Sequence, residues 1–187
     1  MARPGSTKAQ LEGALRKRVA DVIAPNLTVL FCGINPGRYS AAAGHHFAGP
    51  SNRFWLTLFA AGFTPRRFAP ADSRQLLALG YGITNLVSRT TATADELADD
   101  ELRAGARRLR AKVRRLKPRF LAMVGLGAYR IAFERPRAKE GLQPETIGGT
   151  KIWLLPNPSG LNAYHQRVAL VRLFRQLHAA IDVPRGT

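Results

Sequence analysis

Residues 28–37 read TVLFCGINPG, and this stretch decides the fold. Residues 28–34 are almost entirely apolar and rich in β-branched and aromatic side chains, which is typical of a strand buried on both faces. Asn35, Pro36 and Gly37 follow at once and end the strand in a turn. A strand buried on both faces needs helices on both sides of its sheet, so the rest of the chain has to supply them.

Outward from this strand, predicted helices and strands alternate along the chain. Further strands are expected at 83–87, 120–125 and 152–155, and helices at 11–19, 52–61 (capped by Ser51), 74–79, 95–117, 127–133 and 164–181. The alternation predicts an α/β fold, a three-layer α/β/α sandwich around a mostly parallel central sheet. Residues 10–187 are expected to form a single domain, preceded by a mobile basic tail over residues 1–9.

The charge of the chain points to an anionic partner. Of 187 residues, 29 are Lys or Arg and 12 are Asp or Glu, which gives a net charge of +17, while 45% hydrophobic residues leave enough for a core. Arg supplies 23 of the positive charges, and its guanidinium group pairs with phosphate through two hydrogen bonds. Nucleic acid is therefore the first candidate partner, and an anionic membrane surface is the second.

Several classes of protein are excluded or disfavoured by composition. The one cysteine, Cys32, excludes an internal disulfide and every multi-cysteine zinc site, and its apolar surroundings predict a buried, inert thiol. His45 and His46 are adjacent without nearby Cys or acidic residues, which makes a poor metal site. No secretory signal and no 18-residue apolar stretch is present, so we expect a cytoplasmic, nucleoid-associated protein without a membrane span.

Two polar turns stand where predicted strands end. They are GINPG at residues 33–37 and NPSGL at residues 157–161. In α/β sheets, ligands bind at the carboxyl ends of the strands. An Asn in such a turn can orient a water molecule by donating and accepting hydrogen bonds. Both motifs are also ordinary turn sequences, so turn chemistry alone does not establish a site.

The longer pattern around these turns resembles a known family. The segment FCGINPGRYSAAAGHHFAGPSNRFW at residues 31–55 resembles the mismatch-specific uracil/thymine DNA glycosylases of the uracil-DNA glycosylase superfamily, and NPSGL resembles their second motif. The resemblance covers roughly residues 21–181. It implies a single glycosylase domain that flips uracil out of a G·U mismatch in double-stranded DNA and hydrolyses its glycosidic bond. It further implies a monofunctional enzyme with no cofactor and no metal, and we expect a monomer.

The resemblance also assigns roles to individual residues. Asn35 matches the catalytic Asn that positions the attacking water, and Phe47 matches the aromatic ring that stacks on the flipped base. The backbone of Ile34 and Gly37 and the nearby Ser40 are expected at the base. The intercalating, guanine-reading loop corresponds to Gly160, Leu161 and Asn162. His45 and His46 are expected at the pocket mouth, and Asn52 and Arg53 in the packing beneath it.

One feature departs from the family pattern, in which the NPSGL loop continues with Ser-Arg. Here it continues with Asn162 and Ala163, so the arginine that would support the wedge is absent. Tyr164 and His165 are the candidates to replace it, although both are also ordinary residues for the start of a helix.

A general base is missing from both motifs, because an amide has little basicity. Asp95 is the candidate, since it is the first carboxylate after a predicted strand end, but helix capping is the alternative. The stripe Arg103, Arg107, Arg110 and Arg114 is either a phosphate track or a solvated helix face.

Two rival functions stay open from the sequence. The first is a non-catalytic duplex-DNA-binding module of the same fold and charge. The second is a small-molecule α/β enzyme that uses the GINPG turn for phosphate. The second is disfavoured because neither the GxGxxG nor the GxxxxGK[ST] fingerprint is present.

Overall fold

A computed structural model describes residues 12–160 and 167–182 and contains one five-stranded sheet. The strands are β1 (Val29–Gly33), β2 (Tyr81–Asn85), β3 (Phe120–Val124), β4 (Gly141–Ile147) and β5 (Thr150–Leu155), in the order β2-β1-β3-β5-β4. The pairs β1/β2, β1/β3 and β3/β5 are parallel, whereas the edge strand β4 is antiparallel to β5. The sheet is therefore mostly parallel, as predicted. The predicted tail at residues 1–9 lies outside the described residues.

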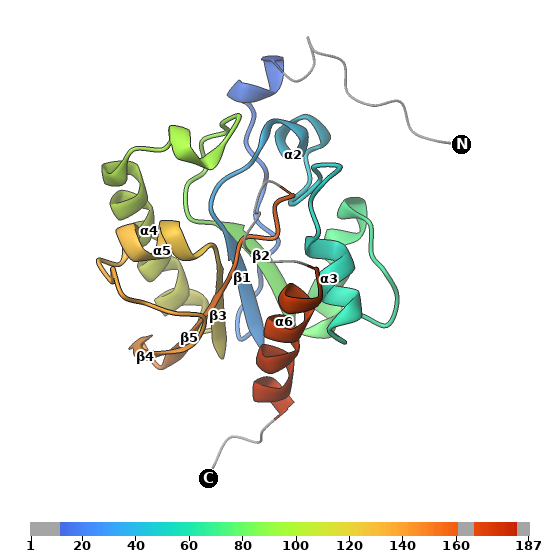
Figure 1. The fold of residues 1–187 in the computed structure, drawn as a ribbon, viewed down its shortest axis with the longest axis vertical. Helices are drawn as coiled ribbons and strands as arrows, with labels where there is room; N and C mark the ends of the chain where they lie inside the picture. The colour runs from blue at the N-terminus through green and yellow to red at the C-terminus, as the bar shows by residue number, and fades with distance from the viewer. Residues whose placement is uncertain (1–11, 161–166, 183–187) are drawn as a thin grey trace.

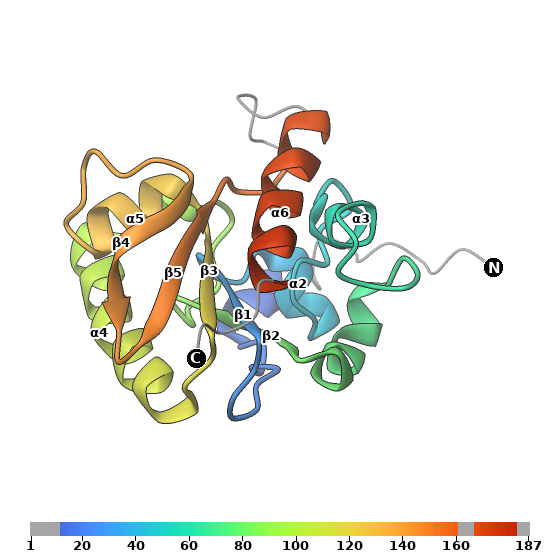
Figure 2. The ribbon, with the colours of Figure 1, turned by 90° about the horizontal axis from the view of Figure 1, so that it is seen from below.

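Helices cover both faces of this sheet. They are α2 (Arg38–Ala43), α3 (Phe54–Ala60), α4 (Asp99–Leu116), α5 (Leu126–Ala132) and α6 (Arg167–Asp182), with 3₁₀ turns η1 (Ala14–Arg16), η2 (Pro70–Leu79) and η3 (Ala94–Glu96). Figure 2 shows α4 and α5 on one side of the sheet and α3 and α6 on the other. The predicted three-layer α/β/α sandwich is thereby confirmed.

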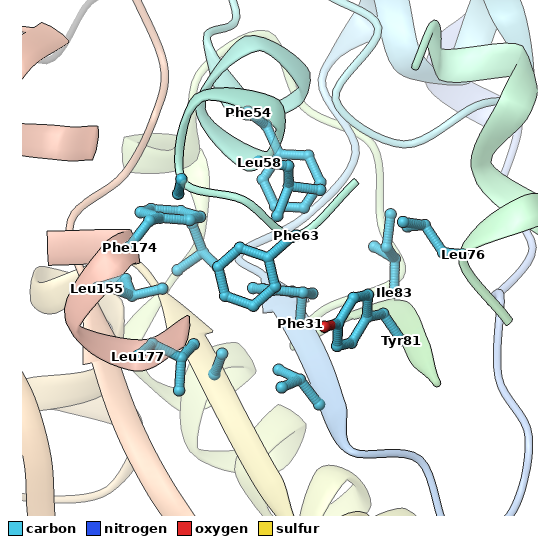
Figure 3. Close-up of a cluster of buried hydrophobic side chains, with 14 of the residues drawn as sticks. Phe31, Phe54, Leu58, Phe63, Leu76, Tyr81, Ile83, Leu155, Phe174 and Leu177 are labelled. Carbon is cyan, nitrogen blue, oxygen red and sulfur yellow. The ribbon is translucent and has the colours of Figure 1, made fainter. Parts of the chain in front are cut away.

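The central strand β1 explains why both layers are needed. All its residues are buried, and alternate side chains enter different cores. Phe31 packs with Phe54, Phe63 and Phe174 beneath α3 and α6, with ring centroids 5.4–6.3 Å apart (Figure 3). Leu30 and Cys32 belong to the other core, which they form together with side chains of α4 and α5. Burial of one such side chain contributes about 1.5–3 kcal/mol, so this strand anchors the fold from both sides.

Strand β4 was not predicted. Its sequence GLQPETI is half-exposed, alternates weakly and contains Pro144, which argues against a central strand. An edge strand tolerates the proline, and β4 pairs with β5 through the turn Gly148-Gly149, in which both residues have positive φ. The glycine pair was the available hairpin signal.

Several predicted element boundaries were wrong. The strand expected at 83–87 spans Tyr81–Asn85, and the helix expected at 95–117 is split into η3 and α4 by extended backbone at Leu97 and Ala98. Two separate N-terminal caps accompany the split. The Glu96 carboxylate accepts hydrogen bonds from the Ala92 and Thr93 amides at the start of η3, and the Glu101 carboxylate accepts one from the Ala98 amide at the start of α4. Near the start of the chain, residues 12–13 are α-helical and η1 follows directly, so the described helical stretch ends at Arg16 instead of residue 19. The start expected at 164 for the last helix lies outside the described residues.

The predicted Ser51 cap was also wrong. Helix α3 begins at Phe54, and the Asn52 side-chain oxygen accepts a hydrogen bond from the Phe54 amide at 2.9 Å. Asn52 therefore supplies the capping oxygen at this end.

The four parallel strands, β1, β2, β3 and β5, all have their carboxyl ends at the same end of the sheet. The loops that follow β1 and β2, together with α2, lie above the sheet in Figure 1. Strand β5 is parallel to β3, so residues 156–160, which follow it, leave the sheet at the same end. Residues 34–53, 86–98 and 156–160 therefore form the loops in which a ligand site of this fold class is expected.

Candidate active site

The side chain of Asn35 is held in a fixed orientation by the loop that follows β2. Its Nδ2 group donates to the Arg89 carbonyl at 2.9 Å and to Thr91 Oγ1 at 2.7 Å. These two bonds use both amide protons, whereas Oδ1 makes no hydrogen bond with any residue of the described part. Asn35 therefore presents an acceptor and has no donor left, which corrects the expectation that it both donates to and accepts from a water.

The loop at 89–93 is itself braced from three sides. Thr91 Oγ1 donates to the Thr93 carbonyl at 2.7 Å, and the Thr91 amide donates to the Pro36 carbonyl at 3.2 Å. The Arg89 guanidinium binds both carboxylate oxygens of Glu101 at 2.7 and 2.8 Å. This hydrogen bond from Arg89, helped by the Ala98 amide, lowers the pKa of Glu101 to about 2. A charged clamp thus fixes the loop that fixes Asn35.

An aromatic ring, a glycine and a second asparagine lie together beside β1. Phe47 has a positive φ of 53°, and its ring stacks on Phe54 with centroids 3.9 Å apart. A Cβ atom built on Gly33 would lie 2.6 Å from Asn85 Oδ1 and 3.1 Å from Phe47 Cζ. Any larger residue at position 33 would clash with both side chains. Glycine at this position therefore allows Phe47 and Asn85 to lie close to the backbone of β1.

Asn85 was missed by the sequence analysis. It is the last residue of β2 and pairs in register with Gly33. The expected strand at 83–87 placed Asn85 in the middle of a strand, which hid its position at the ligand-binding edge. A polar residue at the carboxyl end of a buried strand was the signal, and it became readable once the strand end was known.

His46 is buried behind Asn85 and does not line the pocket mouth as expected. The residue is 2% exposed, and its ring has Nε2 2.9 Å from the Ala20 carbonyl and Nδ1 3.3 Å from Asn85 Nδ2. The Trp55 indole donates to the His46 carbonyl at 3.2 Å, which secures the backbone of this segment. Burial lowers the pKa of His46. His46 is therefore a buried neighbour of the Asn85 side chain.

The second motif is clamped against the start of α3. The Arg53 amide donates to the Pro158 carbonyl at 3.0 Å, and its guanidinium donates to the Ser159 carbonyl at 3.0 Å. A Cβ atom on Gly160 would lie 2.6 Å from Ser51 Cβ, so glycine permits this contact. Arg53 therefore holds residues 158 and 159 against the start of α3, and its packing beneath a base pocket stays a prediction. Leu161 and Asn162 lie outside the described residues.

Three further predicted base-site residues have structural contacts. The Ile34 side chain packs against Gly125, where an added Cβ would lie 2.9 Å from it, and the Ile34 carbonyl accepts from the Val87 amide. Gly37 precedes α2. Ser40 is buried, and its Oγ accepts a hydrogen bond from the Ala48 amide at 3.1 Å, which closes the turn that carries Phe47. Direct contact of these residues with a base stays a prediction.

Asp95 differs from the other acidic residues in its region. It is exposed on η3 and makes no hydrogen bond or ion pair with any described residue. By contrast, Glu96 caps η3, Glu101 binds Arg89, and the carboxylates of Asp99 and Asp100 pair with Arg103. Asp95 is thus an unengaged carboxylate on the loop that holds Asn35, and its role as a base stays a prediction.

The predicted arginine stripe on α4 is only partly available. Arg103 is engaged by Asp99 and Asp100, and the Arg110 guanidinium lies over the Phe133 ring, 4.7 Å from its centroid. Arg107 and Arg114 are exposed and pair with no described residue. Of the four arginines in the stripe, Arg107 and Arg114 are therefore unpaired among the described residues, and whether they form a phosphate track or a solvated helix face stays open.

Within 12–160 and 167–182, no group of three or more His, Cys, Asp or Glu side chains is arranged to hold a metal ion. None of the helices described here is both long enough and apolar enough to cross a membrane. Cys32 is buried, as predicted, and burial raises the pKa of its thiol.

Comparison with known proteins identifies the fold and the family. The fold resembles the solution NMR structure of a Methanosarcina acetivorans protein that is provisionally described as a uracil DNA glycosylase. The TM-score is 0.55 at 19% identity, and the match covers 87% of this chain and 98% of that one. The sequence profile of the uracil DNA glycosylase superfamily matches residues 20–179, which include every described residue of the site. With so much of the chain matched, the protein belongs to the uracil DNA glycosylase superfamily.

Proposed function

We propose that the protein is a DNA glycosylase that excises uracil from duplex DNA by hydrolysis, with the G·U mismatch as its preferred substrate. The observation that carries this proposal is the anchored amide of Asn35, whose Nδ2 is bound to Arg89 and Thr91 while Oδ1 is left without a partner among the described residues. Membership of the superfamily supports the reaction class. The mismatch-specific branch is proposed from the GINPG and NPSGL motifs.

The Asn35 geometry suits the positioning of a water nucleophile. A water that donates a proton to Oδ1 keeps a lone pair free to attack the sugar carbon C1′. The C1′–N1 bond breaks and its electron pair leaves with uracil, while the water oxygen bonds to C1′. The released proton passes to a base, for which Asp95 is the candidate. Because Asn35 cannot take that proton, we expect bond breaking to run ahead of water attack.

Base recognition is assigned to the group around Gly33. A base inside a duplex has to be flipped out before its glycosidic bond is accessible. The Phe47 ring is supported on one face by Phe54, and we assign its other face to the flipped base. Asn85 Oδ1, above Gly33, then meets the Watson–Crick edge of that base. Backbone amides near Ile34 and Gly37 are proposed to stabilise the departing anion.

Duplex binding is assigned to the second motif and to the positive charge. Arg53 holds residues 158 and 159 in place beside the site. The following residues, Leu161 and Asn162, are proposed to fill the gap and to read the widowed guanine. A net charge of +17 favours binding to the phosphate backbone, and a G·U pair costs less to open than a Watson–Crick pair.

The test is an excision assay with an end-labelled duplex in the presence of EDTA, followed by alkaline cleavage of abasic sites. Matched duplexes carry G·U, A·U or G·C at the same position. We expect cleavage at uracil, faster from G·U than from A·U, and none at G·C. Tight duplex binding with intact uracil strands at stoichiometric enzyme would support the non-catalytic module instead. Equal rates for G·U and A·U would refute the mismatch preference alone.

A further inference from the structure

The contact between His46 and Asn85 determines more than packing. His46 Nε2 lies 2.9 Å from the Ala20 carbonyl, and Nδ1 lies 3.3 Å from Asn85 Nδ2. A carbonyl can only accept, so Nε2 has to carry the proton. In a neutral ring, Nδ1 is then an acceptor, and the Asn85 group that faces it has to be the NH₂. The backbone carbonyl of Ala20 thus dictates, through one imidazole, which way the Asn85 amide is turned.

The opposite end of the same amide faces the site. With Nδ2 directed to His46, Oδ1 lies over Gly33, 2.6 Å from the position of an added Cβ and beside the edge of Phe47. Two hydrogen bonds, from His46 Nε2 to the Ala20 carbonyl and from Asn85 Nδ2 to His46 Nδ1, therefore place the Oδ1 acceptor of Asn85 at the assigned base position. Without them, the amide could rotate by half a turn and present its donors to the same place.

We propose that His46 is a positioning residue that fixes the amide of Asn85 with Oδ1 toward the base and thereby selects uracil over cytosine. This inference rests on the proposed function, because it concerns how that site reads its base. Uracil offers an N3–H donor beside the O4 acceptor, which match Oδ1 and the second Nδ2 proton of Asn85. Cytosine offers an N3 acceptor beside an N4 donor, so the same amide orientation opposes it.

The environment of His46 favours the neutral ring that this tautomer requires. Burial lowers the pKa of His46 below 6.5. The Ala20 carbonyl and Asp21 act in the opposite direction, and Lys112 and His45 lower the pKa further. Asp21 and Lys112 pair with each other and with Thr84, so their charges largely compensate. Protonation of Nδ1 would set it against the Asn85 NH₂ and would favour the rotated amide.

The first test uses the free protein and needs no activity. With ¹⁵N-labelled histidine, we expect the NMR signals of His46 at pH 7 to show a neutral ring with the proton on Nε2. Asn85→Ala is expected to shift the Nδ1 signal and to leave the three other histidines unchanged. A charged ring, or a proton on Nδ1 at pH 7, would overturn the proposal whether or not the protein excises uracil.

The second test measures selectivity by single-turnover excision. The substrates are 5-fluorouracil and 5-fluorocytosine opposite guanine, because fluorine improves both leaving groups while their Watson–Crick edges differ. In His46→Phe, the preference for 5-fluorouracil is expected to fall by about fivefold or more, the scale of one lost hydrogen-bond discrimination. His45→Phe, the matched neighbour, is expected to keep the preference. In wild type, the preference is expected to be constant near neutral pH and to decline in acid.

A double-mutant comparison separates positioning from general damage. In an Asn85→Ala background, adding His46→Phe is expected to leave the base preference unchanged, because His46 then has no amide to orient. Full preference in His46→Phe, or an equal effect of His46→Phe in both backgrounds, would overturn the proposal. Failure of wild type to excise either base would instead refute the proposed function, and the NMR result would still decide the tautomer.

Discussion

Asn35 Nδ2 donates to Thr91 Oγ1 across 2.7 Å, a contact that joins the turn after β1 to the loop after β2. The two residues are 56 positions apart in sequence. Thr91 is 1% exposed, and its hydroxyl donates onward to the Thr93 carbonyl. The proposed catalytic amide is therefore oriented by a buried hydroxyl that neither sequence motif contains.

Replacing Thr91 by Val tests this orientation. The variant keeps the shape of the side chain but removes the oxygen that accepts from Asn35, so Nδ2 keeps the Arg89 carbonyl and the longer 3.4 Å contact with the Pro36 carbonyl. Loss of one buried partner costs about 1–3 kcal/mol, and 1.4 kcal/mol corresponds to tenfold in rate. We expect single-turnover uracil excision to slow by about tenfold or more.

Thr90→Val is the matched control. Thr90 is 4% exposed and donates to the Lys17 carbonyl at 2.7 Å, away from Asn35. Both variants lose a buried hydroxyl and should be destabilised to a similar extent. Equal excision rates in the two variants would show that Thr91 contributes only to folding.

Gly33→Ala should obstruct the proposed base position. The added methyl would lie 2.6 Å from Asn85 Oδ1 and 3.1 Å from Phe47 Cζ, so one of these side chains has to move. A displacement near 1 Å can cost on the order of 10²-fold in rate, and we expect a loss of that size in single-turnover excision. Gly127→Ala, where an added Cβ meets nothing within 4 Å, is the control and should keep full activity. Wild-type rates in Gly33→Ala would place the base elsewhere.

The Arg89–Glu101 clamp predicts a specific pH dependence of stability. Hydrogen bonding to Arg89 lowers the pKa of Glu101 from 4.5 to about 2 in the folded protein. A lowered carboxyl pKa stabilises the fold above pH 4.5, and this contribution is lost as the pH falls toward 2. The melting temperature of wild type should therefore exceed that of Glu101→Gln at pH 6 and converge with it in acid.

A control for the clamp comes from the same helix. Asp100 pairs with Arg103, but its side chain is 95% exposed, so Asp100→Asn should change the melting temperature little at any pH. A difference between wild type and Glu101→Gln that persists unchanged down to pH 2 would contradict an ionic origin.

Asp95→Ala tests the candidate base. Since Asp95 is exposed and has no partner among the described residues, its loss should leave the melting temperature unchanged. General-base assistance contributes roughly 10²–10⁴-fold, and we expect excision to slow by at least about tenfold. Asp99→Ala, another exposed carboxylate nearby, should retain the wild-type rate. If both variants match wild type in single-turnover assays, the proton of the water is taken up by solvent.

The sequence predicted the layers well because β1 carries a strong signal. Its continuous apolar run required cover on both faces, and the amphipathic stretches of α4 and α6 supplied it. Strand β4 was missed because an edge strand buries little, and Pro144 is compatible with an edge but not with a centre.

Among the candidate site residues, the motifs proposed Asn35 and Phe47, whereas the contacts that orient these side chains were not predictable. The hydrogen bonds of Thr91, Asn85 and His46 join segments that are far apart in sequence, and such bonds leave no periodic trace in a sequence. An error of two residues at the end of β2 was enough to conceal Asn85, because only a residue at the strand end reaches the ligand-binding edge.

The most direct test of the account compares wild type with Asn35→Ala on the same G·U duplex, measuring the single-turnover excision rate and the dissociation constant together. If Asn35 Oδ1 positions the attacking water, the rate should fall by on the order of 10²-fold or more while the dissociation constant stays close to wild type. An excision rate within about twofold of wild type, or a loss of binding as large as the loss of rate, would contradict it.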